Sequence, residues 1–166
     1  MHDQVVTIQQ QIRDYELEQR PWLTVSGAHL FKPLKAGENP VVRLVYHNSG
    51  KTLAQNIQVS GAFGFVKRLP TQVDQEREPP APNEAGSKAI LEPSGDGGSQ
   101  VRADFALTQE EINGIHNGEF CLLTCGTVQY LDMSKTLHKT KFCFWLVGEE
   151  LENSPMSYCQ FGNGAD

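Results

Sequence analysis

From Trp22 onward, apolar and polar residues alternate over short runs, and turn-forming residues separate each run from the next. In one run, Ile57, Val59, Phe63 and Phe65 all occupy odd positions. Successive side chains of a strand point to opposite faces of its sheet, so this two-residue period is typical of strands with one buried face. No strand-helix-strand repeat is present that would indicate a parallel sheet. The pattern therefore predicts antiparallel sheets.

About seven runs have this character. They cover residues 22–30, 41–47, 57–65, 89–91, 101–105, 119–131 and 138–147. The last two are joined by Asp132-Met133-Ser134-Lys135, a connection short enough to make them an antiparallel hairpin. This number and spacing of strands predicts an all-β fold, an immunoglobulin-like antiparallel β-sandwich.

The segments between the strands are less regular. Residues 67–100 are rich in proline and glycine, including the run 94–99, and are expected to form a long loop in which only 89–91 is an edge strand. Gly61 and Gly64 suggest a bend or bulge in the third strand. Thr108 and Glu111 match a capping box, which predicts one short helix between two late strands.

A chain of 166 residues usually buries one core, so one main domain is expected. Residues 1–20 are predicted as a short N-terminal helical lead-in that ends before Pro21, either solvated or engaged in a coiled coil or with a partner. Residues 21–148 form the predicted sandwich. Residues 149–166 form a tail on its surface, pinned near Tyr158-Cys159.

The charge of the chain argues against nucleic acid as a partner. It has 14 basic and 20 acidic residues and a net charge of -6, so its long-range field repels phosphate backbones. No stretch approaches the roughly 20 apolar residues that a membrane-spanning helix requires. The chain is therefore expected to be soluble, with contact to a membrane only through an anchor that it does not contain.

The four cysteines suggest one disulfide bond. Cys121 and Cys125 project from the same face of a predicted strand, about 13 Å apart along it, and are interpreted as small buried residues rather than as metal ligands or a redox pair. Cys143 lies in the last strand and Cys159 in the tail, which can approach the strand. We therefore predict a structural disulfide between Cys143 and Cys159, provided that the compartment is oxidising.

No catalytic, cofactor-binding or metal-binding residues are assigned from the sequence. Its histidines lack the close spacings of metal sites and are expected at the surface or at strand edges. They are His2, His29, His47, His116 and His138. Gly50-Lys51-Thr52 superficially matches the end of a phosphate-binding loop, but a strand rather than a helix is expected to follow it. Trp22 and Trp145 are interpreted as core or sheet-face aromatics, with a ligand-stacking surface as the alternative.

Four segments support a resemblance to a known group of proteins. They are Arg20-Pro21-Trp22, Asn48-Ser49-Gly50-Lys51-Thr52-Leu53-Ala54, Gly126-Thr127-Val128-Gln129-Tyr130-Leu131-Asp132 and Thr140-Lys141-Phe142-Cys143. The chain resembles uncharacterised bacterial, proteobacterial-type proteins with an N-terminal membrane helix, a Gln-rich linker and an extracytoplasmic immunoglobulin-like sandwich. The resemblance implies a location at the periplasmic face of the inner membrane, with a cytoplasmic protein as the alternative. Its motifs specify a scaffold and no activity.

Together these observations favour a non-catalytic binding domain for an unknown partner, with the loop of residues 67–100 as the recognition element. The alternative is a purely structural spacer in a membrane-anchored assembly. A thiol- or metal-dependent enzyme is a more distant third reading.

Overall fold

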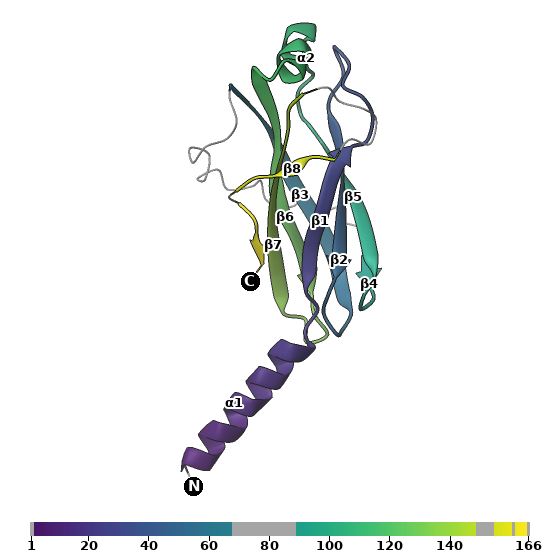
Figure 1. Ribbon diagram of the computed structural model, residues 1–166. Helices are drawn as coiled ribbons and strands as arrows, with labels where there is room; N and C mark the ends of the chain where they lie inside the picture. Colours follow the sequence, from purple (N-terminus) through teal and green to yellow (C-terminus); the bar gives the residue numbers. More distant parts are fainter. Residues whose placement is uncertain (1, 68–88, 149–154, 161, 166) are drawn as a thin grey trace.

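The computed structural model describes residues 2–67, 89–148, 155–160 and 162–165 and has two antiparallel sheets packed face to face (Figure 1). The smaller sheet has the order β1-β2-β5, formed by β1 (Leu23–Leu30), β2 (Val41–Asn48) and β5 (Asp96–Arg102). The larger sheet has the order β4-β3-β6-β7-β8, and β9 also pairs with β7. Its strands are β3 (Ala54–Lys67), β4 (Ala89–Leu91), β6 (Phe120–Leu131), β7 (Leu137–Leu146), β8 (Ser157–Tyr158) and β9 (Gly164–Ala165). The predicted all-β sandwich is confirmed.

The core lies between the two sheets and is built by the alternation seen in the sequence. Even-numbered residues of the hairpin β6–β7 point inward, so that Leu122, Val128, Tyr130 and Phe144 are fully buried. From the smaller sheet, Leu44 packs against the same cluster. Burying each large apolar side chain contributes about 1.5–3 kcal/mol, which makes this interface the main source of stability.

Gly61 of β3 lets the two sheets approach closely. A Cβ atom there would lie 2.9 Å from Cγ1 of Val101 in β5 of the other sheet, and its partner Gly126 in β6 also lacks room for a Cβ atom, which would lie 2.0 Å from the carbonyl oxygen of Ser60. The bulge expected at Gly61 and Gly64 lies elsewhere: the β3–β6 register shifts between Gln55 and Gln58, where Asn56 has a φ of 51°. Gly61 is therefore needed for packing and does not bend the strand.

The glycine-rich run expected to be a loop is largely a strand. Residues 96–102 form β5 and pair with β2 over seven positions. Gly97 lies opposite Tyr46, and a Cβ atom there would lie 2.2 Å from Cε2 of the Tyr46 ring. Glycine is required because the tyrosine ring occupies the side-chain space, so a loop-like composition here reflects packing. The rest of the expected long loop, residues 68–88, lies outside the described residues.

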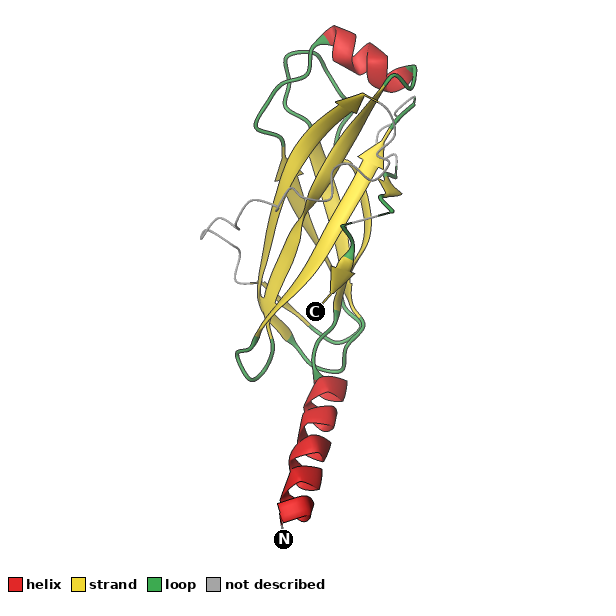
Figure 2. Ribbon diagram, turned by 90° about the vertical axis from the view of Figure 1, so that its left-hand side faces the viewer, coloured by secondary structure: helices red, strands yellow, loops and turns green. Residues whose placement is uncertain are grey.

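The two helices lie at opposite ends of the sandwich (Figures 1 and 2). The N-terminal helix α1 (His2–Gln19) projects away from one end, and its side chains Ile8, Ile12 and Tyr15 are more than half exposed. Helix α2 (Gln109–His116) covers the other end and begins with the predicted capping box. Neither of these described helices is long and apolar enough to span a bilayer.

Asn48 organises the end of the sandwich next to α1. Its side chain is completely buried, and Oδ1 accepts hydrogen bonds from the backbone N–H groups of Trp22 (3.1 Å) and Gly50 (3.0 Å). Its Nδ2 donates to the carbonyl oxygens of Thr52, Leu91 and Glu92. The Asn48 side-chain amide thus joins three chain segments. Gly50 has no room for a side chain at this end, because a Cβ atom there would lie 2.4 Å from the carbonyl oxygen of Arg20.

Candidate functional site

The outer face of the larger sheet carries a second apolar cluster, separate from the core, that contains all four cysteines. Odd-numbered residues of β6 and β7 point to this face because even-numbered residues point inward. We call it the outer cysteine cluster. Its buried members are Cys121, Leu123, Cys143 and Cys159, and its partly buried members are Val66, Cys125 and Trp145.

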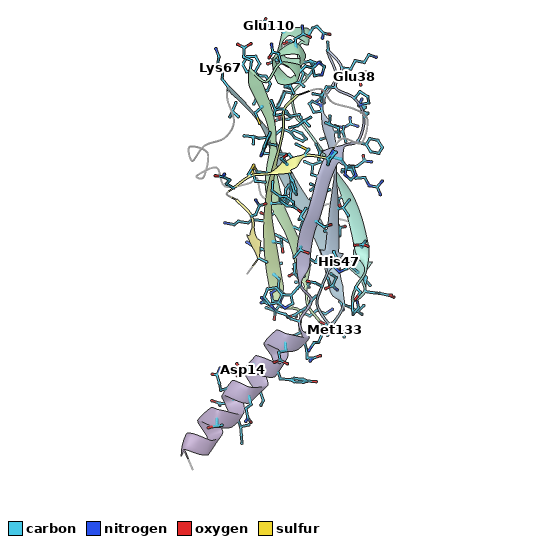
Figure 3. All side chains as sticks on the ribbon, in the orientation of Figure 1. Asp14, Glu38, His47, Lys67, Glu110 and Met133 are labelled. Atoms are coloured by element: carbon cyan, nitrogen blue, oxygen red, sulfur yellow. A yellow bond between two sulfur atoms is a disulfide. The ribbon has the colours of Figure 1, made fainter. Side chains whose placement is uncertain are left out.

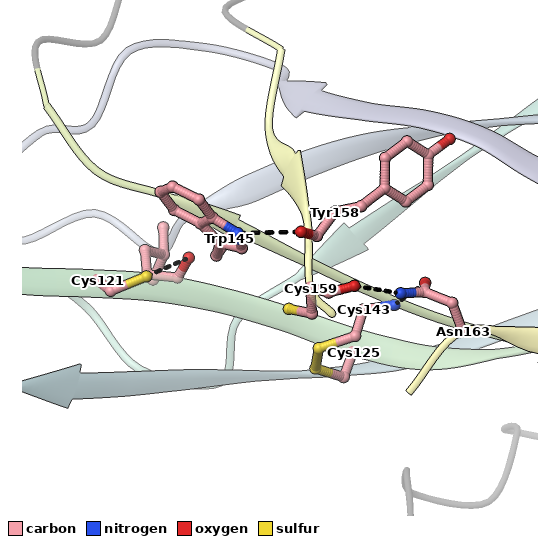
Figure 4. Close-up of a disulfide and its surroundings, with 8 residues drawn as sticks. Cys121, Cys125, Cys143, Trp145, Tyr158, Cys159 and Asn163 are labelled. Atoms are coloured by element: carbon pink, nitrogen blue, oxygen red, sulfur yellow. Dashed lines mark hydrogen bonds between the residues drawn. A yellow bond between two sulfur atoms is a disulfide. The ribbon is translucent and has the colours of Figure 1, made fainter. Parts of the chain in front are cut away.

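Three of these cysteines form a row across neighbouring segments (Figure 4). Cys125 of β6 lies directly opposite Cys143 of β7, and the two are joined by a disulfide bond. Cys159 follows β8, and its backbone N–H donates to the carbonyl oxygen of Cys143 over 3.0 Å. The three sulfur atoms all lie within 4.8 Å of one another. Within the described residues, this is the only group of three or more His, Cys, Asp or Glu side chains with such spacing.

Asn163 and Gly162 hold the C-terminal segment against Cys143. The side chain of Asn163 accepts a hydrogen bond from the Cys143 N–H (2.9 Å) and donates one to the carbonyl oxygen of Cys159 (2.8 Å). Gly162 has a φ of +74°, and a Cβ atom there would lie 3.2 Å from the Cβ of Cys143. The position of the Cys159 thiol is therefore set by backbone contacts that do not involve its sulfur.

The segment around β8 also ties the two sheets together. The Nε1 of Trp145 donates to the carbonyl oxygen of Tyr158 (3.1 Å), and the Tyr158 hydroxyl donates to the carbonyl oxygen of Val25 in β1 (3.1 Å). The Tyr158 ring packs on Phe144 with a centroid separation of 4.6 Å. The segment near Tyr158-Cys159 thus bridges β7 and β1 at the open side of the sandwich.

Burial controls the protonation of the two thiols that are not in the disulfide. Desolvation raises the pKa of Cys159 to about 12, and its proximity to Cys121 adds to this effect. Desolvation likewise raises the pKa of Cys121 to about 11. Both are therefore neutral thiols near pH 7, and neither is an activated nucleophile.

The predicted disulfide Cys143–Cys159 is replaced in the structure by Cys125–Cys143. The prediction named Cys143 correctly and placed the C-terminal tail beside β7, but the bonding partner of Cys143 is Cys125 of β6 and not Cys159. Cys121 and Cys125 share a sheet face, as expected. Of these two, Cys121 is a free and buried cysteine, whereas Cys125 is partly buried and forms the disulfide. The missed signal was the hairpin register: the structure pairs Leu131 with Leu137, which brings Cys125 opposite Cys143.

The histidines described by the structure do not join this cluster. The sequence predicted histidines at the surface or at strand edges; His138 lies near the start of β7 but is buried rather than at the surface, and its Nε2 lies 2.9 Å from Oδ2 of Asp132. His47 forms an exposed pair with Asp96, whose Oδ1 lies 2.9 Å from its Nδ1. Lys51 lies in a bend between β2 and β3, so the expected strand, and no helix, follows the apparent phosphate-loop motif.

Fold and site together define an all-β sandwich protein with a disulfide and a third thiol gathered on the outer face of one sheet. No family model matches the chain, and comparison with curated proteins and with solved structures found no significant match.

Proposed function

We propose that this chain is a non-catalytic interaction module, carried on α1 and presenting the opposite end of its sandwich to a protein partner. The observation that carries the proposal is the placement of the two helices at opposite ends of the molecule (Figure 2). A chain tethered through its N-terminal helix would hold the α2 end farthest from the tether. We call the connections β1–β2 and β5–α2–β6, together with α2, the distal end.

The strand order supports an immunoglobulin-like class for the module. Strands 1, 2 and 5 form one sheet and strands 3, 6 and 7 the centre of the other. The immunoglobulin fold distributes its A, B, E and C, F, G strands in the same way. In such folds the loops at the ends of the sandwich carry recognition, because the sheets hold them rigidly while their sequences vary.

The distal end offers both apolar and charged groups to a partner (Figure 3). Phe31, just after β1, has 45% of its surface exposed. Lys32 follows Phe31 in the chain and pairs with the Glu38 carboxylate, as does Lys35, and the hydrogen bonds from these two lysines, Lys32 first, lower the pKa of Glu38. Protein interfaces typically combine aromatic residues in their buried centre with polar groups at their rim.

The Cys125–Cys143 disulfide supports a location at the periplasmic face of a bacterial inner membrane. Disulfides persist in oxidising compartments and are rare in the cytosol. Rapid acid quenching and alkylation of the protein in cells, followed by peptide mapping, tests this location. Recovery of Cys125 and Cys143 as free thiols would instead favour the cytoplasmic alternative.

Site-specific photocrosslinking in cells distinguishes an interaction module from a structural spacer. A photoreactive residue replaces Phe31 or Glu110 at the distal end, and Met133 at the end next to α1 serves as the matched exposed control. The interaction module predicts one defined adduct from both distal positions and none from Met133. A structural spacer predicts no adduct from the distal positions, and that result would refute the proposed interaction function.

A second variant examines the long connection between β3 and β4. Replacing residues 71–85 with a short Gly/Ser linker leaves both strands intact. If recognition uses this connection, as the sequence predicts, the distal adduct is lost while far-UV circular dichroism remains unchanged. An unchanged adduct would restrict recognition to the β1–β2 connection and α2.

A further inference from the structure

We propose that Cys125, Cys143 and Cys159 form a redox-gated site for a thiophilic metal ion of the Zn²⁺ class. The disulfide closes the site, and reduction of Cys125–Cys143 opens it. The proposal rests on the convergence of three sulfur atoms from three different chain segments, and it is independent of the interaction function proposed above.

The spacing of the sulfur atoms fits thiolate coordination. Zn–S bonds of about 2.3 Å in tetrahedral geometry place the sulfur atoms roughly 3.8 Å apart. The three sulfurs lie within 4.8 Å of one another while Cys125 and Cys143 are still bonded. Breaking that bond lets these two sulfurs separate to van der Waals distance, toward the spacing that a metal requires. Small side-chain rotations therefore suffice.

The backbone holds the three ligands in place before a metal binds. Cys125 and Cys143 belong to paired central positions of the β6–β7 hairpin. The Cys159 N–H donates a hydrogen bond to the Cys143 carbonyl oxygen, and the Asn163 side chain forms hydrogen bonds with the backbone of both residues. Asn163 is thus a positioning residue, which acts on the ligands through their backbone. A site with ordered ligands binds metal more tightly because less conformational freedom is lost.

The surroundings of the row favour neutral thiols until a metal ion binds. Leu123 and Trp145 limit access of water to the sulfur atoms, so the positive charge of the metal ion is what would stabilise the thiolates. Lys141 lies on the same face of β7 as Cys143, two residues away, and is exposed. Three thiolates around one divalent ion carry a net charge of about −1, which this cation would partly balance.

The row supplies three ligands within the described part of the chain. Cys121 lies on the same strand face as Cys125 but four residues away, about 13 Å along the strand, and is too distant to be a fourth ligand. The fourth coordination position is then open to water or a small external ligand, as in zinc sites that bind an exogenous group.

The chemistry balances with a dithiol as the reductant. The dithiol transfers two electrons and two protons to the Cys125–Cys143 bond, which becomes two thiols while the dithiol closes to a cyclic disulfide. Zn²⁺ then replaces the protons of three thiols, and three protons are released as three Zn–S bonds form. Because metal binding releases these protons, it should weaken as pH falls.

Metal titration of the full chain tests the site. The reduced protein, freed of excess dithiol, is titrated with Zn²⁺ against a chromophoric chelator and with Co²⁺, whose thiolate charge-transfer absorption reports sulfur ligands. We expect one equivalent bound by the reduced chain and none by the oxidised chain. Substitution C125S, C143S or C159S should abolish this stoichiometric binding, and N163A should weaken it about 10–100-fold. C121S is the matched control and should bind normally.

Differential alkylation of the wild-type chain supplies a readout that does not depend on how variants fold. Zn²⁺ should slow alkylation of Cys125, Cys143 and Cys159 in the reduced protein and leave Cys121 unchanged. Equal effects on all four cysteines, or normal metal binding by C159S, would overturn the proposal. These outcomes are separate from the crosslinking results, which concern the distal end.

Discussion

The Cys143 N–H donates a hydrogen bond to Oδ1 of Asn163 over 2.9 Å, although 20 residues separate them along the chain. The same amide group donates from Nδ2 to the carbonyl oxygen of Cys159. A single side chain thereby joins the β7 strand to the segment that carries the third thiol of the row. Together with the hydrogen bond from the Cys159 N–H to the Cys143 carbonyl oxygen, this contact sets the position of Cys159.

Asn163→Ala should expose Cys159. Two hydrogen bonds are lost, worth about 2 kcal/mol together, so the open state of the segment should become roughly thirtyfold more populated. The rate of Cys159 alkylation, followed by mass spectrometry in native buffer, measures this change. Ser157→Ala, an exposed substitution in the same segment, is the control and should leave the rate unchanged. Equal rates for all three proteins would mean that other contacts hold the segment.

Cys125→Ala should transfer the disulfide to Cys143–Cys159 under oxidising conditions, because the Cys159 sulfur already lies within 4.8 Å of its new partner. Peptide mapping without reduction identifies the bond. The new bond closes a loop of similar length, so C125A should retain most of its stability. Cys143→Ala cannot form either bond and should lose about 3 kcal/mol. Free thiols at both Cys143 and Cys159 in oxidised C125A would contradict this expectation.

Asn48→Ala should lower the free energy of unfolding by about 3 kcal/mol. The substitution leaves two backbone N–H groups and three carbonyl oxygens without their shared partner, and buried unsatisfied groups each cost about 1–3 kcal/mol before relaxation and entry of water. Chemical denaturation monitored by circular dichroism gives the value. Asn113→Ala on the exposed side of α2 should change stability by less than about 0.5 kcal/mol. An equally small change in the free energy of unfolding for Asn48→Ala would show that water replaces the hydrogen bonds of the Asn48 side chain.

Asp132 should make stability sensitive to acid. Its burial acts to raise its pKa, but hydrogen bonds from His138 and from the Thr136 N–H, together with the His138 charge, outweigh burial and hold the pKa below its usual value. A lowered pKa in the folded state means that the stabilisation is present above the unfolded value, about 3.9, and is lost as pH falls through the folded one.

Asp132→Asn should therefore be less stable than the wild type at neutral pH, and the difference should shrink at low pH as the wild-type carboxylate becomes protonated. Denaturation midpoints measured between about pH 2 and pH 7 test this. Asp104→Asn, at an exposed position, is the control. A stability difference that stays constant across this range would show that Asp132 acts through packing alone.

Much of the secondary structure could be predicted because its signals are local. The two-residue alternation located β6 and β7, the Thr108 and Glu111 capping box located α2, and even the short edge strand β4 was identified. Each of these follows from side-chain direction or backbone hydrogen bonding over a few residues. The main error, β5, arose because Gly97 makes room for the ring of Tyr46, which is more than 50 residues away in the sequence.

The cysteine site was harder to predict because it depends on register. A shift of one residue in the hairpin would turn the partner of Cys125 from Cys143 to a residue on the opposite face. The structure sets this register in the β6–β7 connection, where the Asp132 side chain accepts a hydrogen bond from the Thr136 N–H (2.9 Å) and its own N–H donates to the Thr136 carbonyl oxygen (3.1 Å). Composition alone could not distinguish this register from one shifted by a single residue.

By itself, the sequence determined that this chain forms antiparallel strands with one apolar face each, since alternation and turn residues act within a few positions. Only the tertiary structure decided which cysteines meet, because three sulfur atoms from β6, β7 and the segment after β8 converge through strand register and through Asn163. Convergence of distant residues depends on how the sheets and the C-terminal segment pack, and no local pattern encodes it.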